Sequence, residues 1–383
     1  MDALTTPSNW QKVRLGDIAT FLKGKGLSKS QVSSNAKHEC ILYGELFTYY
    51  DRVITNIKNF TNIYNNPILS LSNDVLMSGS AETPDILATA SCILKEGVIL
   101  GSDILIIRPN SNLLSGCFLA YCIVCDKNQV LSKVVGSTVY HLYAKDLKDF
   151  EIPLPPLNEQ IAIANILSDV DHYLCSLDAL ILKKESVKKA LSFELLSQRK
   201  RLKGFNQAWQ RVRLGDICEI TTGSLDANEM VHYGKYRFYT CAKEYYFIDK
   251  YAFDTEAILI SGNGAYVGYV HYYKGKFNAY QRTYVLDNFS EHIIFVKYFL
   301  TMFLQSHIQT NRNEGNTPYI VMGTLKDFEI PLPPLNEQIA IANILSALDH
   351  EIISLKNKKR QFENIKKALN HDLMSAKIRV LKK

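Results

Sequence analysis

The stretch LKDFEIPLPPLNEQIAIANILS occupies residues 147–168 and recurs without a change at residues 325–346. A second pair of stretches, WQKVRLGDI at 10–18 and WQRVRLGDI at 209–217, differs by one residue. The chain is therefore a tandem duplication in which two constant segments follow two divergent ones. This pattern does not indicate a solenoid, because solenoids need three or more short repeats.

The duplication divides the 383 residues into four segments. We predict a variable domain, a constant helix, a second variable domain and a second constant helix, at 1–150, 151–205, 206–330 and 331–383. Hydrophobic residues make up 47% of the chain, which is enough for large cores. The N-terminal residues lack the apolar stretch of a secretion signal, and no long uncharged apolar run suggests a membrane span. With eight scattered cysteines, these features predict a cytoplasmic protein with reduced thiols.

The constant segments have the pattern of long helices. Pro155 and Pro156 can precede a helix or occupy its first turn, and no proline falls between residues 157 and 203. Apolar residues then recur at spacings of three and four: Leu167, Val170, Leu174, Leu177 and Ile181. A helix of roughly 45 residues would be about 65–70 Å long. Such a helix with one apolar stripe needs a partner, and the second copy can supply it.

The charges indicate how the two helices pair. Residues 151–182 contain five acidic and no basic residues, whereas 183–203 contain eight basic and two acidic ones. The second copy has the same gradient, with three acidic and no basic residues at 331–355 and ten basic against two acidic at 356–383. Antiparallel pairing sets each acidic half against a basic half. Complementing the helix dipoles is the alternative explanation, but it accounts for the signs and not for the length of the charged tracts.

The variable segments are predicted to be mixed α/β domains. Residues 104–107 and 257–260 have the composition of short buried strands. Residues 74–80 resemble 257–263, so the two inserts are diverged versions of one fold. An apolar helix is expected near the end of each, at 118–124 and 295–301. The predicted fold class is α/β (α+β): two mixed domains joined by two long antiparallel helices that form a coiled coil, with pseudo-two-fold symmetry.

Sequence patterns of catalysis and metal binding fail when they are compared with the internal copy. Cys117, Cys122 and Cys125 have the spacing of iron–sulfur ligands. The second copy has apolar residues at the matching positions, Ile294, Phe299 and Met302. The glycine-rich loop at 24–30 lacks the ending of a phosphate-binding loop. We therefore predict no catalytic residue and no metal ligand in this chain.

Two kinds of segment are candidates for DNA contacts. Residues 271–282 interleave aromatic side chains with bases and amides, which suit phosphates and purine edges, although a hairpin with a solvated face is the alternative. The loop at 136–140 aligns with 315–319, and such a turn could hold phosphate or be purely structural. The candidates are polar, basic or aromatic residues in predicted loops or in these segments: Lys23, Lys25, Lys29, Ser80, Thr83, Ser137, Thr138, Tyr140, Asn263, Tyr273, Lys274, Lys276, Asn278, Gln281, Arg282, Arg312, Asn316 and Thr317.

The duplicated IPLPPLNEQIAIA blocks at 152–164 and 330–342, the two W-x-x-V-x-L-G-D-I openings and the long helices resemble the specificity subunit of a Type I restriction-modification system. The resemblance covers essentially the whole chain. It implies a non-catalytic subunit with two target recognition domains, each reading one half of a split DNA target. It also implies that the helices set the gap and dock methyltransferase subunits. The family's base-contacting residues vary with the target, so none is carried over.

The same resemblance implies the partners and cofactors. The partners are double-stranded DNA, methyltransferase subunits and restriction (motor) subunits, with no membrane. S-adenosylmethionine, ATP and Mg belong to those partner subunits, and no cofactor is expected in this chain. The rival interpretations are a DNA-modifying enzyme with a cryptic catalytic domain, a coiled-coil interaction protein and a transcription regulator. Residues 1–150 carry a net charge of +1 and residues 204–330 a net charge of −1, so the chain alone should bind DNA weakly.

Overall fold

The computed structural model describes residues 10–62, 65–311 and 318–380, and its chain folds as two compact units. Unit 1 is formed by the chain up to Asp178 and from Asn357 onward. Unit 2 is formed by Ala179–Lys356. Each unit therefore holds one variable domain together with part of each constant helix. Among the described residues, no helix is both long enough and apolar enough to cross a membrane.

The two constant helices are α6 (Leu157–Leu196) and α10 (Leu335–Met374), of 40 residues each. Each helix begins directly after a Pro-Pro pair, as the sequence predicts, because proline favours the position before a helix and not its interior. At 1.5 Å per residue, each helix is about 60 Å long. They are shorter than the predicted segments, since Gln198 and Ala376 have positive φ angles of 62° and 54° just after the helices end.

The residues before each helix form a strand, which the sequence analysis did not predict. Strand β12 (Glu151–Leu154) pairs antiparallel with β1 (Gln11–Arg14), and β20 (Glu329–Leu332) pairs in the same register with β13 (Gln210–Arg213). The short helices α1 (Leu15–Ile18) and α7 (Leu214–Ile217) follow β1 and β13. The two pairs of matching sequence stretches thus meet in space and close each variable domain.

The first variable domain, called domain 1 below, is built on a five-stranded sheet. Its strand order is β2 (Ala19–Lys23), β10 (Ile104–Pro109), β6 (Asp74–Ser78), β8 (Ser91–Ile93) and β4 (Val53–Ile54). A second sheet contains β5 (Asn59–Thr61), β3 (His38–Ile41) and β9 (Ile99–Leu100), and β11 (Tyr140–His141) pairs with β7 (Ser80–Ala81). The helices are α2 (Glu45–Thr48), α3 (Pro84–Leu87), α4 (Gly116–Cys125) and α5 (Lys127–Leu131), with 3-10 turns at Lys29–Gln31 and Ala144–Leu147.

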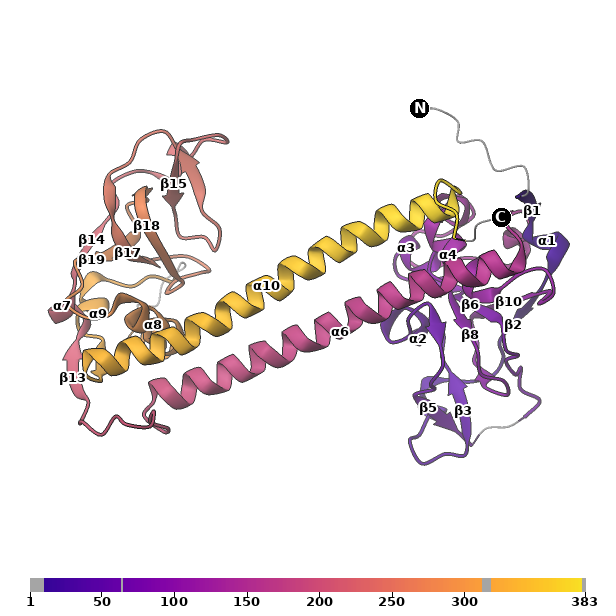
Figure 1. The fold of residues 1–383 in the computed structure, drawn as a ribbon, viewed down its shortest axis with the longest axis horizontal. Coiled ribbons are helices and arrows are strands. Elements are labelled where there is room, and N and C mark those ends of the chain that lie inside the picture. The colour runs from indigo at the N-terminus through magenta and orange to yellow at the C-terminus, as the bar shows by residue number, and fades with distance from the viewer. Residues whose placement is uncertain (1–9, 63–64, 312–317, 381–383) are drawn as a thin grey trace. The chain divides into compact units, whose positions relative to one another are not determined.

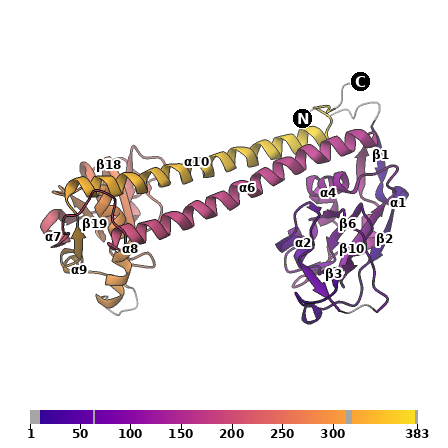
Figure 2. The same ribbon diagram turned by 60° about the horizontal axis from the view of Figure 1, so that its bottom comes forward.

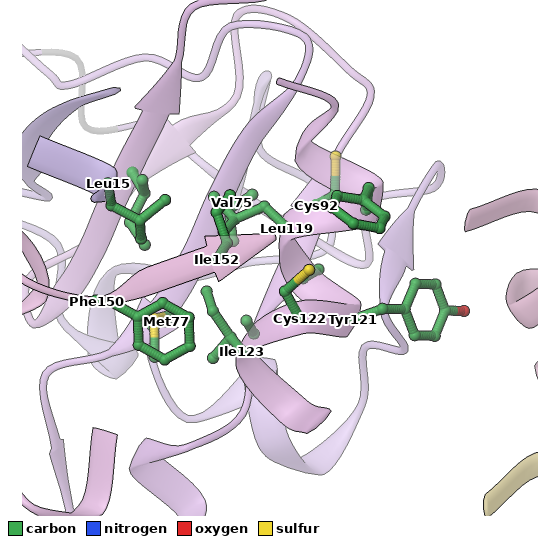
Figure 3. Packing of buried hydrophobic residues seen from close by; sticks show 14 of the residues in the cluster. Leu15, Val75, Met77, Cys92, Leu119, Tyr121, Cys122, Ile123, Phe150 and Ile152 are labelled. Carbon is green, nitrogen blue, oxygen red and sulfur yellow. The ribbon is translucent and has the colours of Figure 1, made fainter. Parts of the chain in front are cut away.

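The main core of domain 1 lies between the sheet, α4 and the ends of the constant helices. Val75 and Met77 from β6 pack with Leu119 and Ile123 from α4, and all four are almost fully buried (Figure 3). The predicted apolar helix at 118–124 is confirmed as the body of α4. Because the strand and helix are apolar on their facing sides, their burial drives the packing of the domain.

The second variable domain, called domain 2 below, has a six-stranded sheet. Its order is β14 (Glu219–Thr222), β19 (Thr283–Asp287), β17 (Phe253–Ser261), β18 (Val270–Ala279), β15 (Tyr236–Tyr239) and β16 (Tyr246–Ile248). The other elements are α8 (Ile293–Asn311), α9 (Met322–Lys326) and a 3-10 turn at Ala227–Glu229. The neighbours β14, β19 and β17 repeat the antiparallel pairing of β2, β10 and β6. This confirms that the two inserts share one fold. The alternative of a hairpin around Lys274-Gly275-Lys276 is wrong, because β18 runs through these residues.

The constant helices pack antiparallel within each unit (Figures 1 and 2). In unit 1, Asp171 and Asp178 of α6 pair with Lys366 and Lys359 of α10. In unit 2, Lys184 and Lys188 of α6 pair with Glu351 and Asp349 of α10. Residue numbers rise along one helix as they fall along the other, and acidic halves meet basic halves. The prediction of antiparallel pairing from charge is confirmed.

The same polar contacts hold each domain on the helices. In unit 1, the Trp10 indole N–H and the Arg379 guanidinium both donate to the carboxylate of Glu159, and Tyr121 donates to Asp171 at 2.8 Å. Unit 2 repeats the set, with Trp209 and Arg201 on Glu337 and Tyr298 on Asp349 at 2.6 Å. Burial, the largest single cause, opposes ionisation of Asp349, but the hydrogen bonds from Lys188 and Tyr298 and the charges of Lys188 and Lys297 together lower its pKa. Burial, followed by the hydrogen bond to Asp349, raises the pKa of Tyr298.

Candidate nucleic-acid interface

One end of the central strands in domain 1 is organised by three backbone hydrogen bonds. The Gly24 N–H donates to the Ile104 carbonyl at 2.8 Å, and the Gly79 N–H donates to the Asp103 carbonyl at 2.6 Å. The Leu142 N–H in turn donates to the Gly79 carbonyl at 3.0 Å. These bonds bring together the end of β2, the turn between β6 and β7, the start of β10 and the end of β11.

Domain 2 has the same three bonds between the equivalent elements. The Gly223 N–H donates to Thr283 at 3.2 Å, Gly262 donates to Arg282 at 2.8 Å, and Ile320 donates to Gly262 at 2.9 Å. These matching bonds show which positions of the two domains are equivalent. We call the side chains around them the strand-end site, which consists of Lys23, Ser80, Asp103 and His141 in domain 1 and of Thr222, Asn263, Arg282 and Tyr319 in domain 2.

The equivalence corrects the sequence alignment of the loop by one residue. Leu142 and Ile320 make the same bond, so Tyr140 corresponds to Pro318 and not to Tyr319. Antiparallel pairing supports this, because His141 lies opposite Ser80 and Tyr319 lies opposite Asn263.

The strand-end site of domain 1 contains an ion pair. The Lys23 ammonium lies 2.8 Å from Asp103 Oδ1, and the Ser80 hydroxyl donates to Oδ2 at 3.3 Å. The hydrogen bond from Lys23 lowers the pKa of Asp103 more than its partial burial raises it. Asp103 has a φ of +61°, a left-handed conformation that aspartate tolerates better than most residues. Lys23 keeps 60% of its side chain exposed, so it is oriented by Asp103 and still accessible.

The strand-end site of domain 2 contains a cation at the position of Asp103. Arg282 is exposed and forms no ion pair within the described residues. Asn263 is half-buried and its backbone forms a bridge with Tyr319, which is exposed. The predicted residue Asn263 directly follows Gly262, whose N–H donates to the carbonyl of the predicted residue Arg282. Tyr319 lies at the end of the candidate loop 315–319 but was not named as a contact residue. Asp103, His141 and Thr222 were not predicted, because no sequence motif marks them.

The other predicted residues of domain 1 are dispersed. Ser137 and Thr138 lie in an exposed turn closed by backbone bonds between Val135 and His141, and Tyr140 is half-buried beside them. The remaining three are exposed and are not part of the strand-end site as defined: Lys25, Lys29 and Thr83. Ser80 is buried and its hydroxyl is bonded to Asp103, so it supports the site from within. DNA contact by these residues stays a prediction.

The aromatic–basic stretch of domain 2 is largely satisfied within its own sheet. Lys274 and Lys276 pair with Glu256 and Asp254, their neighbours on β17. Asn278 is removed from the predicted set, because it is buried and its amide nitrogen donates to the Lys250 carbonyl at 3.1 Å. Gln281 is exposed, so within this stretch it and Arg282 keep accessible side chains without an ion pair in the part of the chain that the structure describes.

An arginine–tyrosine cluster on β15 and β18 was missed. The Arg237 guanidinium lies 4.2 Å from the ring centre of Tyr245 and 4.5 Å from that of Tyr273, and it donates to the Tyr239 hydroxyl at 3.4 Å. Tyr273 was predicted, but its partners are distant in sequence and only the strand pairing unites them. The cluster places a delocalised cation over the rings of Tyr245, which is exposed, and Tyr273, which is half-buried.

Three predicted residues, Arg312, Asn316 and Thr317, lie outside the described residues. Within the described ranges, no group of three or more His, Cys, Asp or Glu side chains is placed to hold a metal ion. The three cysteines with iron–sulfur spacing differ in their surroundings: Cys122 is buried, Cys117 is half-buried and Cys125 is exposed. Burial, the largest cause, raises the pKa of both Cys122 and Cys125.

Known proteins and structures resemble this chain. The specificity subunit of the Type I restriction enzyme EcoDI from Escherichia coli is 40% identical over 162 residues, which cover 42% of this chain and 35% of that protein. The MjaVIII specificity subunit from Methanocaldococcus jannaschii is 25% identical over 99% of this chain and 95% of its own length. The crystal structure of a Type I restriction-modification S subunit from M. genitalium matches 97% of this chain and 98% of its own with a TM-score of 0.72, at 19% identity.

The duplicated frame and the two related domains agree with these matches. The family model described as the Type I restriction modification DNA specificity domain matches residues 7–184 and 206–364, one match for each half of the duplication. The chain therefore belongs to the Type I restriction-modification DNA specificity family and carries its domain twice.

Proposed function

We propose that this chain is the non-catalytic specificity subunit of a Type I restriction-modification complex that works in the cytoplasm. Each variable domain reads one half of a bipartite target on double-stranded DNA. The two constant helices set the distance between the half-sites and dock the methyltransferase subunits. Restriction (motor) subunits join the same complex.

The observation that carries the proposal is the strand-end site. The two domains keep the same backbone hydrogen bonds around it, while all four of its side-chain positions differ. A constant backbone with interchangeable polar side chains is the arrangement that sequence reading requires, because base edges are distinguished by their patterns of donors and acceptors. Two different versions on one frame are suited to two different half-sites.

The chemistry of modification and cleavage is assigned to the partners. Methyl transfer to adenine would use S-adenosylmethionine in the methyltransferase subunits, and cleavage would use ATP and Mg in the motor subunits. This chain contributes recognition and position. Because both variable domains are nearly neutral, they neutralise few phosphates by themselves, and the partner subunits must supply most of the affinity for DNA.

The experiment is a comparison of adenine methylation across a genome with and without this gene. We expect one bipartite methylated motif to disappear with the gene and to return on complementation. A chain that, when purified without partners, methylates or cuts DNA would replace the proposal with an enzyme. An unchanged set of methylated motifs, with the partner subunits present and active, would overturn the proposal.

A further inference from the structure

Resting on the proposed function, we propose that Arg282 reads a guanine in the second half-site and that Lys23, held by Asp103, is the corresponding reader of the first half-site. The two side chains come from different positions of the strand-end site. Each places one cationic donor at the same end of the central strands of its own domain.

The geometry supports the same location in both domains. Arg282 and Asp103 are equivalent residues. The Arg282 carbonyl accepts a hydrogen bond from Gly262, which follows β17, and the Asp103 carbonyl accepts one from Gly79, which follows β6. Lys23 reaches this position from β2 and bonds to Asp103 at 2.8 Å. In domain 2 the residue equivalent to Lys23 is Thr222, which carries no charge, and the cation comes from Arg282 itself.

The absence of an ion pair within the described residues separates Arg282 from the neighbouring lysines. Lys274 and Lys276 lie opposite acidic residues on the adjacent strand, and those pairs stay within the sheet. Arg282 is exposed and has no ion pair among the described residues, so it can approach a ligand without breaking a bond. Because the net charge of the domain is near zero, one exposed arginine without an ion pair adds little to the overall attraction of DNA. It is better suited to a specific contact.

The side-chain chemistry identifies the base. The planar guanidinium offers two parallel N–H donors, which match the O6 and N7 acceptors of guanine in the major groove. The ammonium of Lys23 can donate to the same acceptors. Asp103 and Ser80 fix the position of Lys23, and Asp103 acts through it as a positioning residue. Asn263, whose backbone is bridged to Tyr319, directly follows the glycine that bonds to the Arg282 carbonyl and supplies an amide to the same site.

The experiment measures the methylated motif in cells that lack the natural gene and express the methyltransferase partners with a variant of this chain. The variants are Arg282→Ala, Arg282→Gln and Lys23→Ala. Arg211→Ala is the matched control, because it removes a positive charge from the same domain where that charge is already paired, with Glu329. All three side chains are exposed, so folding should be kept, and circular dichroism of each purified variant verifies it.

We expect Arg282→Ala to relax one guanine position of the second half-site and to lower discrimination there by about 5- to 150-fold. Arg282→Gln should shift the same position toward adenine, since a glutamine amide matches the adenine edge. Lys23→Ala should relax one position of the first half-site, and Arg211→Ala should leave both half-sites unchanged.

Two results would overturn the inference while leaving the proposed function intact. In the first, the wild type methylates a bipartite motif and the Arg282 variants methylate the same motif at a uniformly reduced level, as expected of a phosphate contact. In the second, the relaxed position lies in the first half-site. If instead the wild type supports no bipartite methylation while the partners are active, the proposed function itself fails.

Discussion

Arg201 binds the carboxylate of Glu337 through two nitrogen atoms, at 3.1 and 2.6 Å, although 136 residues separate them in the chain. Glu337 is fully buried at the start of α10, and the Trp209 indole also donates to it at 3.2 Å. The residues at an offset of 178, Glu159 and Arg379, form the same pair in unit 1. Each unit therefore fixes the chain segment that follows one helix to the first turn of the other helix.

Removal of Arg201 should destabilise unit 2. Arg201→Ala leaves a buried carboxylate with one indole donor, and we expect a loss of about 2–3 kcal/mol in the free energy of unfolding. Arg211→Ala is the control, because its pair with Glu329 is exposed and should contribute about 0.5 kcal/mol or less. Urea denaturation followed by tryptophan fluorescence measures both. Equal losses for the two variants would contradict a special role for the buried pair.

Gly223→Ala should disrupt domain 2. A Cβ atom at this position would lie 1.9 Å from the Ala279 carbonyl oxygen and 2.6 Å from the Tyr280 carbonyl oxygen, and these backbone atoms cannot move aside as a flexible side chain could. We expect a loss of about 3 kcal/mol, at the upper end of measured costs of overpacking. Gly323→Ala in α9 is the control, since its Cβ would meet nothing within 4 Å. Thermal unfolding of the two variants tests this, and a normal melting temperature for Gly223→Ala would refute the close approach.

The sequence was sufficient for the features that depend on periodicity and on repetition. The apolar spacing from Leu167 to Ile181 predicts the helix, the Pro-Pro pairs predict its start, and the charge gradients predict its direction. Asp171–Lys366 and Asp349–Lys188 then confirm that direction. These features depend on local patterns, so a single sequence with an internal copy contains them.

Contacts between distant residues could not be predicted in the same way. Glu159 lies in the first turn of α6, where a negative charge is favourable, but its bonds to Trp10 and Arg379 depend on the tertiary fold. Asp103 carries no motif, and only the hydrogen bond from Gly79 shows that it is equivalent to Arg282. Asn278 has suitable chemistry for DNA but points into the sheet, a distinction that follows from strand register and not from residue type.

Acidification should weaken unit 2 through His271. Burial lowers the pKa of His271, against a backbone bond to Ala242 and the nearby Glu244. A group neutral in the folded state and protonated when unfolded contributes stability that is lost as pH falls below its unfolded pKa of about 6.5. His271→Asn should therefore flatten the decline in melting temperature between about pH 7 and pH 5. Burial also lowers the pKa of His292, so part of the decline in melting temperature should remain in the His271→Asn variant.

The exposed His232→Asn is the control for this effect, because its side chain is open to solvent in both states. Its melting temperature should fall with pH as steeply as that of the wild type. A His271→Asn variant with an unaltered slope would show that the buried imidazole does not govern the acid sensitivity of unit 2.

Lengthening both helices together should lengthen the gap in the DNA target. Four residues inserted after Leu180 in α6 and four after Asn357 in α10 keep every ion pair on either side in register, including Asp178–Lys359 and Lys184–Glu351. Each insertion adds about 6 Å and a rotation of about 40°, which correspond to one or two base pairs of B-DNA. The methylated motif should keep both half-sites while its gap grows by that amount.

Insertion in α6 alone is the control, because it shifts the ion pairs of α6 against α10 and should destabilise the chain. An active double-insertion variant with the original gap would show that the helices do not set the spacing.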